Sequence, residues 1–549
     1  MAAITPRTSI VWALALRVAG ADVSSRLTGT VTIDREEGAA GLATFVMQPP
    51  AGAVDPLAWI GKDVEIDYVG TADGESRTAR RFTGKIAAPR FDPVTRLLTC
   101  ECSDQLQNRI EAMTLDQVDA LVGGQWSSDL FEPAEGRSRW DYAQERLGTL
   151  TASLDASPRG DLRVTSWYAQ APAFTFGAGT SVFGSVSVSL AELDSLTNVV
   201  ELAAGVRWPR LWQQSILYAW AHPKGGGTTG LNGFCLWRKD STELPTTEMI
   251  AQAVEGAGLK VTGRGFYTAP LSMPNPCGDG IPWINQYDNL ALEARVTGTR
   301  RWVQQITEAL TLRVEATGSV SQAGELIARN SLSIGIEDDR SDTWEDGATQ
   351  GGPTQFTDLV NASRREQGLR CGLAQAVAEI VSSHRETAVS WQAPAAHTLD
   401  VDLVHTLELS DQGVRARGKC RRIQEEYSFD SGSALVTLTI AVMRGGGTVT
   451  DALTVPAVST AGDSLAQFQL PGGNPLETQL GGRTTSPAYR DDLDGFAGNW
   501  STSDDTTAVK FTRRFDVTAP EVSEKLRDED VRKQTATYRL AIPNDLLEL

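Results

Sequence analysis

Apolar and polar residues alternate along residues 8–102 with a period of two, which is typical of β-strands. In the clearest segment, Arg26–Arg35, one face carries Leu27, Gly29, Val31 and Ile33. The pattern predicts strands at Ile10–Val18, Arg26–Arg35, Leu42–Gln48, Asp63–Tyr68, Arg80–Ile86 and Leu97–Cys102. Turn residues separate these strands at the spacing of a small barrel or sandwich.

The spacing becomes helical after residue 103, where Ser103-Asp104 has the character of a helix cap. Helices are predicted at Leu106–Met113, Asp116–Val122, Ser138–Leu147, Thr246–Ala257, Arg301–Leu312 and Phe356–Ser383, the last with a break near Gly368. Strands are predicted again at Asn198–Val206, Leu211–Tyr218, Glu325–Ile336, residues 398–443 and Thr535–Ile542. Beyond Gly445-Gly446-Gly447 the chain is rich in Gly, Pro, Thr and Asp up to about residue 507. We expect an extended arm there that packs on neighbouring chains or partner proteins.

Residues 92–102 and 430–440 align with each other without a gap, and each segment begins with an Asp that follows a Phe. Gly84-Lys85 and Gly418-Lys419 occupy comparable places upstream, each after a strand with basic residues. Both segments therefore have the order strand, Gly-Lys, strand, Phe-Asp turn, strand. This order predicts two related β-domains, one on each side of a central insertion.

The repeat also bears on Cys100 and Cys102, which could be read as a metal-binding pair. The aligned residues in the second copy are Leu438 and Ile440. Residues i and i+2 of a strand share a face. We therefore expect both thiols to point into an apolar core, where free cysteine packs as a small hydrophobe.

Together these patterns predict a mainly-β α+β fold, in which two similar small β-barrel or sandwich domains flank a mixed α/β insertion. The first barrel is predicted at residues 1–103. The central region is predicted at 104–397, as one or two subdomains, with a helical part at 104–170. The second barrel is predicted at 398–444, completed by other segments, and the arm with a final strand-like segment at 445–549.

The length of 549 residues corresponds to about three to five domains. The formal charge of −19 disfavours a grip on duplex nucleic acid or an anionic membrane. No apolar run reaches the ~18 residues of a membrane helix, so we expect no stable membrane insertion. Six cysteines in so long a chain do not form a disulfide framework, which favours maturation in a cytoplasm.

No catalytic, cofactor or metal site is predicted. The histidines, His222, His384, His397 and His405, form no ligand set. Ser464 lacks the second glycine of a nucleophile elbow, and the glycines near Gly177 miss the dinucleotide spacing. The acidic groups at residues 337–339, 345–346 and 491–494 are interpreted as solvated loop residues rather than as a glycosidase pair or a calcium loop.

Tryptophans form a further candidate set. Trp208, Trp212 and Trp220 cluster with Arg210 in one β-region, where an interface and a core are equally compatible with the sequence. Trp500 lies in the expected arm, where an interface is favoured.

Four segments resemble the first barrel of tailed-bacteriophage baseplate hub proteins: residues 27–35, 60–66, 82–86 and 97–104. Residues 198–202 look like the start of the central region of that family, and residues 405–442 are similar to its second barrel. The resemblance covers about residues 8–443 discontinuously, through β-patterns rather than a catalytic signature.

The resemblance implies a structural protein of the virion tail tip, assembled in the host cytoplasm, and not an enzyme. Hub proteins of this family form homotrimers, so that three chains with two barrels each make six near-equivalent units. Such a ring would adapt a six-fold tail tube or distal tail protein to a three-fold tip. Its other partners would be the tape-measure protein, further tail-tip or fibre proteins, and DNA only in transit through the channel.

Two other hypotheses come from different classes of protein. A tail-associated glycosidase or cell-wall hydrolase would use the acidic pairs as acid and base. A receptor-binding adhesin would use the central insertion and its tryptophan-rich strands as the binding surface.

Overall fold

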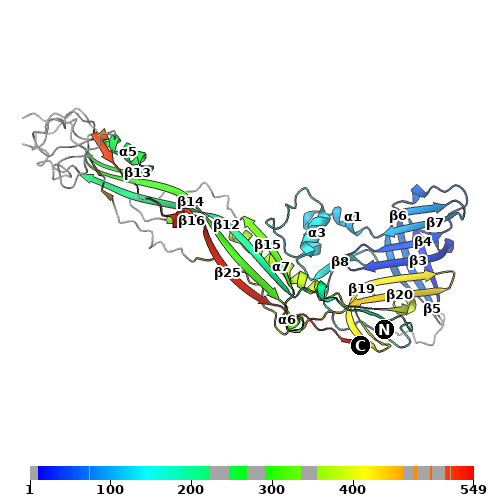
Figure 1. Ribbon diagram of the computed structural model, residues 1–549. Coiled ribbons are helices and arrows are strands. Elements are labelled where there is room, and N and C mark those ends of the chain that lie inside the picture. Colours follow the sequence, from blue (N-terminus) through cyan, green and yellow to red (C-terminus); the bar gives the residue numbers. More distant parts are fainter. Residues whose placement is uncertain are drawn as a thin grey trace, which may run out of the picture.

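The computed structural model describes residues 10–72, 75–221, 246–268, 291–335, 355–460 and 521–549, with short pieces between 474 and 519. Figure 1 shows a β-rich body from which the two long strands β12 and β14 run as an arm towards α5 and β13. Predictions that fall on Cys235, Cys277, His222, Ser464, Trp500 and the three acidic groups lie outside the described residues.

The body is built on a 14-stranded sheet. Its strands are β1 (Ile10–Val18), β2 (Ala21–Asp22), β3 (Leu27–Glu36), β4 (Leu42–Met47), β5 (Asp63–Ala72), β6 (Glu75–Asp92), β7 (Leu97–Ser103), β10 (Phe174–Gly177), β11 (Ser187–Ser189), β17 (Ala388–Pro394), β18 (Thr406–Asp411), β19 (Val414–Ser428), β20 (Ser433–Ala441) and β26 (Leu547–Glu548). The order along the sheet is β11-β17-β20-β19-β3-β4-β7-β6-β5-β1-β2, with β10 next to β18, and β18 and β26 next to β19.

The arm is a seven-stranded sheet. Its strands are β12 (Val199–Ala221), β13 (Lys260–Thr268), β14 (Ala291–Glu315), β15 (Ile327–Gly335), β16 (Gln355–Asp358), β21 (Asn474–Pro475) and β25 (Asp530–Arg539). At ~3.3 Å per residue, the 23 residues of β12 span about 75 Å. The remaining strands are β8 (Ala152–Ala156) with β9 (Leu162–Ser166), and the small sheet of β22 (Glu477–Thr478), β23 (Gly495–Phe496) and β24 (Arg513–Asp516).

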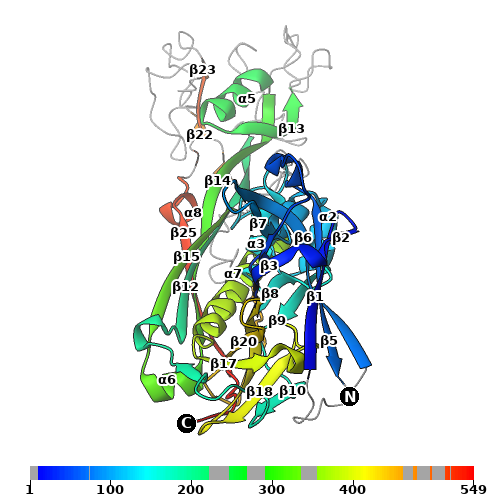
Figure 2. The ribbon, with the colours of Figure 1, turned by 90° about the vertical axis from the view of Figure 1, so that its right-hand side faces the viewer.

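Helices cover the two sheets locally. They are α1 (Leu106–Glu111), α2 (Leu115–Val122), α3 (Arg139–Leu147), α5 (Thr247–Gly256), α6 (Thr317–Ala323), α7 (Ala362–Ser383) and α8 (Glu524–Arg527), with short 3-10 turns at Ser24–Arg26, Pro56–Trp59, Leu193–Ser195 and Ala395–His397. The helix α7 lies along the base of the arm, beside β12 and β15 (Figure 2). No helix among the described residues is long and apolar enough to cross a membrane.

The prediction of a mainly-β α+β fold is confirmed. The sequence left a barrel and a sandwich open for the two β-rich parts, and the described strands form no closed barrel. The two β-rich parts instead share one sheet, since β19 pairs with β3 in an antiparallel ladder from Arg422↔Glu36 to Ser428↔Thr30.

The helices predicted between residues 106 and 147 are confirmed. Ser138 is the N-cap of α3, where its hydroxyl accepts the amide of Asp141. Cys100 and Cys102 are 0% and 2% exposed in the apolar core, as the repeat predicted. Burial raises the pKa of the Cys100 thiol to about 12, so this thiol stays protonated and unreactive.

The helix predicted at Arg301–Leu312 is wrong, because these residues belong to β14. The core face of this strand includes the polar residues Gln304 and Glu308. Trp212 Nε1 donates to Gln304 Oε1 at 2.8 Å, and Arg365 Nε donates to Glu308 Oε2 at 2.7 Å. Buried polar residues on the core face hid the period of two in the hydropathy pattern.

The predicted break near Gly368 is also wrong, since α7 is continuous and Phe356 belongs to the separate strand β16. Two glycines let this helix approach the arm sheet closely. A Cβ on Gly368 would lie 2.6 Å from Ile334 Cδ1, and one on Gly372 would lie 2.8 Å from Leu202 Cδ2. These glycines serve packing rather than helix termination.

The described parts of residues 445–549 pack on the chain's own sheets. Asp451 pairs with Arg539 at 2.9 Å, and β25 lies parallel to β14 from Ile306↔Asp530 onwards. The chain then returns to the body, where β26 pairs with β19. The described parts therefore do not form a free extended arm, because the edge of β14 offers an unpaired ladder for β25. Packing of this segment on other chains stays a prediction.

Candidate assembly interface

The body contains two units with the same strand order. We define the first unit as β5-β6-β7-β4-β3 and the second unit as β18-β19-β20-β17-β11. In both units all neighbours are antiparallel, and the first three strands form two consecutive hairpins. The second unit differs mainly in that the arm is inserted between β11 and β17.

A β-bulge occurs at the same place in each unit. The β6–β7 register shifts between Ile86 and Ala88, and the β19–β20 register shifts between Cys420 and Arg422. Bulges are specific features of a strand pair, so their coincidence supports a common architecture for the two hairpins.

The bulge residues also make the same backbone hydrogen bond. The amide of Ile86 donates to the carbonyl of Lys62 at 3.0 Å, and the amide of Cys420 donates to the carbonyl of His405 at 2.9 Å. The two acceptors each lie one residue before the strand that pairs with the bulged one. The correspondence therefore extends from the second hairpin of each unit to the first.

Gly84 and Gly418 are equivalent and lack a side chain for the same reason. A Cβ on Gly84 would collide with the carbonyl oxygen of Ser103, and one on Gly418 would collide with that of Ala441. Ser103 and Ala441 face Lys85 and Lys419, the residues that follow the two glycines. The Gly-Lys match in the sequence thus marks a close backbone approach in each unit.

The gapless alignment of residues 92–102 with 430–440 is a structural equivalence only for β7 and β20, the second strands of the β6–β7 and β19–β20 hairpins. Cys100 faces Pro89 and Leu438 faces Ile423, so the strands β7 and β20 correspond as aligned. The second hairpin is longer, because its ladder continues to Ser428↔Ser433. Phe91 is consequently equivalent to Glu425, and the shared Phe-Asp pair in the sequence is not a structural equivalence.

A buried ion pair joins the two units across the β19–β3 seam. Arg81 Nε and Nη2 donate to the two carboxylate oxygens of Glu425 at 2.9 and 2.7 Å, and Arg81 Nη1 donates to the carbonyls of Thr398 and Leu399. Tyr427 donates its hydroxyl to Glu425 at 2.6 Å. Burial, and then the charge of Glu425, raises the pKa of Tyr427 well above its ordinary value.

A second cluster ties both units to the helical part of the body. Asp402 accepts hydrogen bonds from Arg35 at 2.7 Å and from Arg163 at 2.6 Å. Arg163 also donates to Asp155, which lies on β8. Burial alone raises the pKa of Asp402, but the hydrogen bond from Arg163 and the charges of Arg35 and Arg163 outweigh it and lower the pKa to about 2.

The sheet has one covered and one uncovered face. Alternate residues of the shared sheet enter a single apolar core, which includes Phe45 and Trp391 from the equivalent strands β4 and β17. The other face carries mainly hydroxyl, amide and a few charged side chains. Its half-buried or exposed residues include Thr32, Thr44, Thr99, Ser390, Gln392, Gln424, Glu426, Thr437 and Thr439.

Within the two units, two strand edges are open in the described structure. The strand β11 pairs only with β17, so its other edge is free. The half of β6 that follows the bulge, residues 88–92, pairs only with β7, because the β5 ladder ends at Asp63↔Lys85. Exposed apolar side chains lie at both edges: Leu190 (59% exposed) and Phe183 (91%) near β11, and Val94 (90%) after β6.

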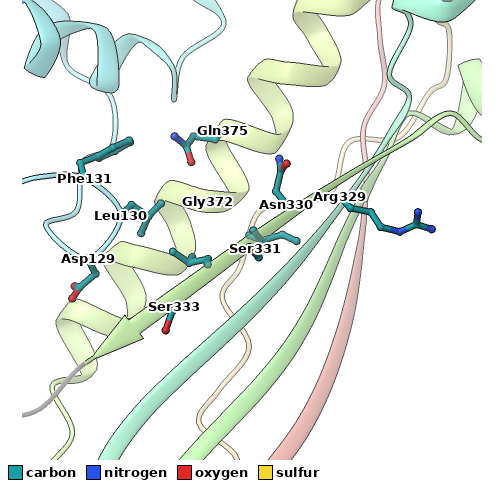
Figure 3. Close-up of a pocket in the computed structure, with 11 residues that line it drawn as sticks. Asp129, Leu130, Phe131, Arg329, Asn330, Ser331, Ser333, Gly372 and Gln375 are labelled. Atoms are coloured by element: carbon teal, nitrogen blue, oxygen red, sulfur yellow. The ribbon is translucent and has the colours of Figure 1, made fainter.

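A cavity of about 590 Å³ lies between the 129–131 loop, β15 and α7. Figure 3 shows the side chains that line it. Its charged wall residues have partners within the chain. Asp129 accepts from Arg364, and Arg329 pairs with Glu201 at 3.1 Å. Asn330 donates to Glu379 at 3.0 Å. The cavity presents no acid–base pair, and we assign it no chemistry.

The structure settles the core-or-interface question for the described tryptophans. Trp208 and Trp212 are each 1% exposed. Arg210, between them, forms a bidentate ion pair with Asp358 at 2.6 and 2.7 Å. These residues form the arm core, so they offer no binding surface to an adhesin. The side chain of Trp220 lies outside the described residues.

The histidines that the structure describes are structural as well. His384 is 3% exposed, and its Nδ1 lies 2.7 Å from the carbonyl of Ile380. His405 Nδ1 accepts the amide of Asp402. Among the described residues, no group of three His, Cys, Asp or Glu side chains could hold a metal ion.

Sequence reasoning missed both open edges. The signal at β11 was present, because Val186, Val188 and Leu190 alternate with two serines. The segment was too short to stand out among loops. The ion pair of Arg81 and Glu425 could not be found from local sequence patterns, because 344 residues separate the two partners.

Comparison with solved structures gives similar chains of low identity. A tail protein from Neisseria meningitidis is 11% identical, with a TM-score of 0.36 over 78% of this chain and 96% of that one. The 43 kDa tail protein of a Shewanella oneidensis prophage is 11% identical, with a TM-score of 0.35 over 78% and 98%. An Escherichia coli type VI secretion component, described as structurally similar to T4 bacteriophage tail proteins, is 8% identical, with a TM-score of 0.30 over 81% of each chain.

These similar structures are tail proteins and a related secretion component, the class of protein that the sequence resembles. No protein-family model matches the chain. No curated protein matches it either. The role of this chain is therefore inferred from its own geometry.

Proposed function

We propose that this protein is the structural hub of a bacteriophage tail tip, and that three copies form a ring of six near-equivalent β-units. The observation that carries the proposal is the duplication within the body sheet. Two units share strand order, bulge position and glycine–carbonyl contact, and the chain joins them edge to edge through β19 and β3.

The seam within the chain is a head-to-tail contact, because the β19 edge of one unit meets the β3 edge of the other. The equivalent edges, on β6 and β11, remain open at the two ends of the pair. Repetition of a head-to-tail contact generates either a closed ring or an open filament. Closure after three chains gives pseudo-six-fold symmetry from a true three-fold arrangement.

The elements outside the units occur once per chain. They include α1 to α3, the long arm of β12 and β14, and the extension of the β5–β6 hairpin beyond the length of β18 and β19. A trimer would therefore present six similar units on its ring and three copies of each appendage. This suits contact with a six-fold tail tube or distal tail protein on one side and a three-fold tip with other tail or fibre proteins on the other.

The uncovered face of the sheet suits the wall of a channel. Its hydroxyl and amide side chains are hydrated, and its arginines Arg90 and Arg422 are paired with Glu101 and Asp34, which reduces their availability to phosphates. The formal charge of −19 acts in the same direction. We propose that this face lines the path of the tape-measure protein and then of the genome, which passes in transit only.

The test is the symmetry of the assembled protein. Mass measurement of the purified full chain and cryo-electron microscopy of the native particle should give three copies around one axis, with six similar β-units next to the channel. Monomers within assembled particles, or body sheets that lie away from the axis, would overturn the proposal. Sustained hydrolysis of host-envelope polysaccharide by the purified chain would favour the hydrolase hypothesis instead.

A further inference from the structure

We propose that the next copy of this chain adds its β11 to the open edge of β6, antiparallel, with Phe91 facing Val188 and Arg90 facing Ser189. This inference rests on the proposed function and names the surface through which neighbouring chains meet. It comes from the equivalence of the two units, with the seam inside the chain as the template.

The equivalence identifies both partner strands. The strand β6 after its bulge corresponds to β19 after its bulge, because Phe91 faces Leu98 where Glu425 faces Val436. The strand β11 corresponds to β3, because β11 pairs with β17, β3 pairs with β4, and β17 and β4 are equivalent strands of the two units. In the chain, β19 pairs with β3. The same contact repeated between chains therefore pairs β6 with β11.

The register comes from two further pairs. Ile33 faces Ala43 on β4, and Val188 faces Val389 at the equivalent position on β17. Ile33 therefore corresponds to Val188. Within the chain Ile33 faces Glu425 across the seam, and the residue equivalent to Glu425 is Phe91. The register between chains then places Phe91 against Val188.

The side chains at the two open edges fit this partner. The seam inside the chain is charged on its core side, where Glu425 and Arg35 lie. The equivalent positions between chains are Phe91 and Leu190. Phe91 and Val188 already pack at the margin of the body core, and Leu190 is 59% exposed, so contact between chains would extend that core across the boundary.

The backbone groups of β6 and β11 can also form ladder hydrogen bonds, except at Pro89. Pro89 is equivalent to Ile423, and proline carries no amide hydrogen, so the ladder loses one donor at this residue. The β11 strand has only three residues, Ser187–Ser189, which matches a short ladder. Burial of apolar side chains rather than a long ladder would then hold the chains together.

Cross-strand disulfides test the register directly. In the internal seam, Phe429 donates its amide to Gly29, and Glu37 donates to Arg421. Gln424 and Asp34 thus form a non-hydrogen-bonded pair, in which the Cα atoms approach most closely. Arg90 and Ser189 are the equivalent residues. The double variant Arg90→Cys/Ser189→Cys of the full chain should form covalent dimers and trimers under mild oxidation.

The matched control is Asp92→Cys/Ala191→Cys. These positions lie on the same face, but the proposed register separates them by about four residues, roughly 13 Å, which is too far for a disulfide. The unsubstituted chain is oxidised in parallel to account for its own thiols. Cross-linking of the control pair in preference to Arg90/Ser189 would overturn the register.

A second variant tests the surface without oxidation. Leu190→Glu should leave the monomer folded, because this side chain is 59% exposed in the single chain, but should reduce the trimer at least tenfold at equal concentration. The control is Val303→Glu, which is 55% exposed and lies on β14 of the arm sheet, away from both edges. A trimer that tolerates Leu190→Glu and lacks the Arg90–Ser189 cross-link would overturn this inference and leave the proposed function standing. A chain that is monomeric in native particles would overturn both.

Discussion

Among single residues, Gly84 and Gly418 give the clearest evidence that the two units are equivalent. Gly84 and Gly418 sit where a Cβ would collide with a backbone carbonyl, and backbone cannot move aside as a flexible side chain can. The Gly-Lys match is visible in the sequence, and the structure supplies its physical reason. A residue that looks like a turn former is in each case a strand residue under a close contact.

We expect Gly84→Ala and Gly418→Ala each to lower the free energy of unfolding by about 1–3 kcal/mol, because the added methyl group must push the facing strand away. The measurement is chemical denaturation of the full chain. Gly335→Ala is the matched control, since a Cβ there meets nothing within 4 Å. An equal loss in the control variant would contradict the argument.

A pH dependence is expected from Asp402, whose pKa is lowered to about 2 from the ordinary value of 3.8. The ionised carboxylate therefore stabilises the fold above about pH 4, and this contribution is lost as the pH falls from about 4 towards 2. Asp402→Asn should cost about 2–4 kcal/mol at pH 7, because Arg35 and Arg163 lose their shared partner, and much less at pH 2.

The control for this variant is Asp400→Asn. Asp400 pairs with Arg77 at 3.2 Å, but both side chains are more than half exposed, so the pair contributes little. Denaturation curves at pH 7 and at low pH should separate the two positions. A cost of Asp402→Asn that did not change with pH would show that the ionised form is not what stabilises the fold.

Among the strands and helices, the pairing of β19 with β3 joins the two units into one continuous sheet. The buried ion pair of Arg81 and Glu425, which links the two units, carries a large desolvation free energy, because both charges lose their hydration water. The bidentate geometry and the two backbone carbonyls on Arg81 satisfy the guanidinium. By contrast, the proposed contact between chains is apolar on its core side, so no charged group there must lose its water when the chains meet.

We expect Glu425→Gln to destabilise the body by about 3–5 kcal/mol, because it leaves the Arg81 charge buried without a counter-ion. Arg81→Met/Glu425→Leu should cost less than the sum of the two single changes, since both charges are then removed. A double-mutant cycle by chemical denaturation measures the coupling. Additive costs would mean that the two side chains do not act as a pair.

Individual strands also show where the hydropathy pattern fails. The predicted helix at Arg301–Leu312 is a strand because its buried face includes Gln304 and Glu308, whose partners lie on other elements. In a short segment, the hydropathy pattern treats these two residues as solvent-exposed. The remaining apolar residues then have the spacing of a helix. The helices α2 and α3 were predicted correctly because their capping residues, Thr114 and Ser138, and their apolar faces lie within one segment.

In the molecule as a whole, the C-terminal segment ties the arm to the body. Tyr538, Leu540 and Ile542 enter the core at the base of the arm, and Leu547 pairs with β19. The order of the chain therefore differs from the order of the fold, since β25 completes an arm sheet that begins at residue 199 and β26 completes a body sheet that begins at residue 10.

We expect truncation after residue 520 to expose the edge of β14 and the core at the base of the arm, while the body sheet stays folded. Limited proteolysis should then cut the arm sequences faster than in the full chain. Removal of residues 547–549 alone is the control, because it takes away only the short β26. Faster cutting of the body strands in the long truncation would contradict a separate role for β25.

Local sequence patterns were enough to establish the mainly-β character, the two related hairpins and the burial of Cys100 and Cys102. These features depend on a period of two and on local turns, which any short window contains. The three-dimensional fold was needed to show that both units share one sheet, that the second hairpin is longer, and that Arg81 meets Glu425. The physical reason is that strand edges and buried charges are satisfied by partners hundreds of residues away, and no local pattern specifies which partner that is.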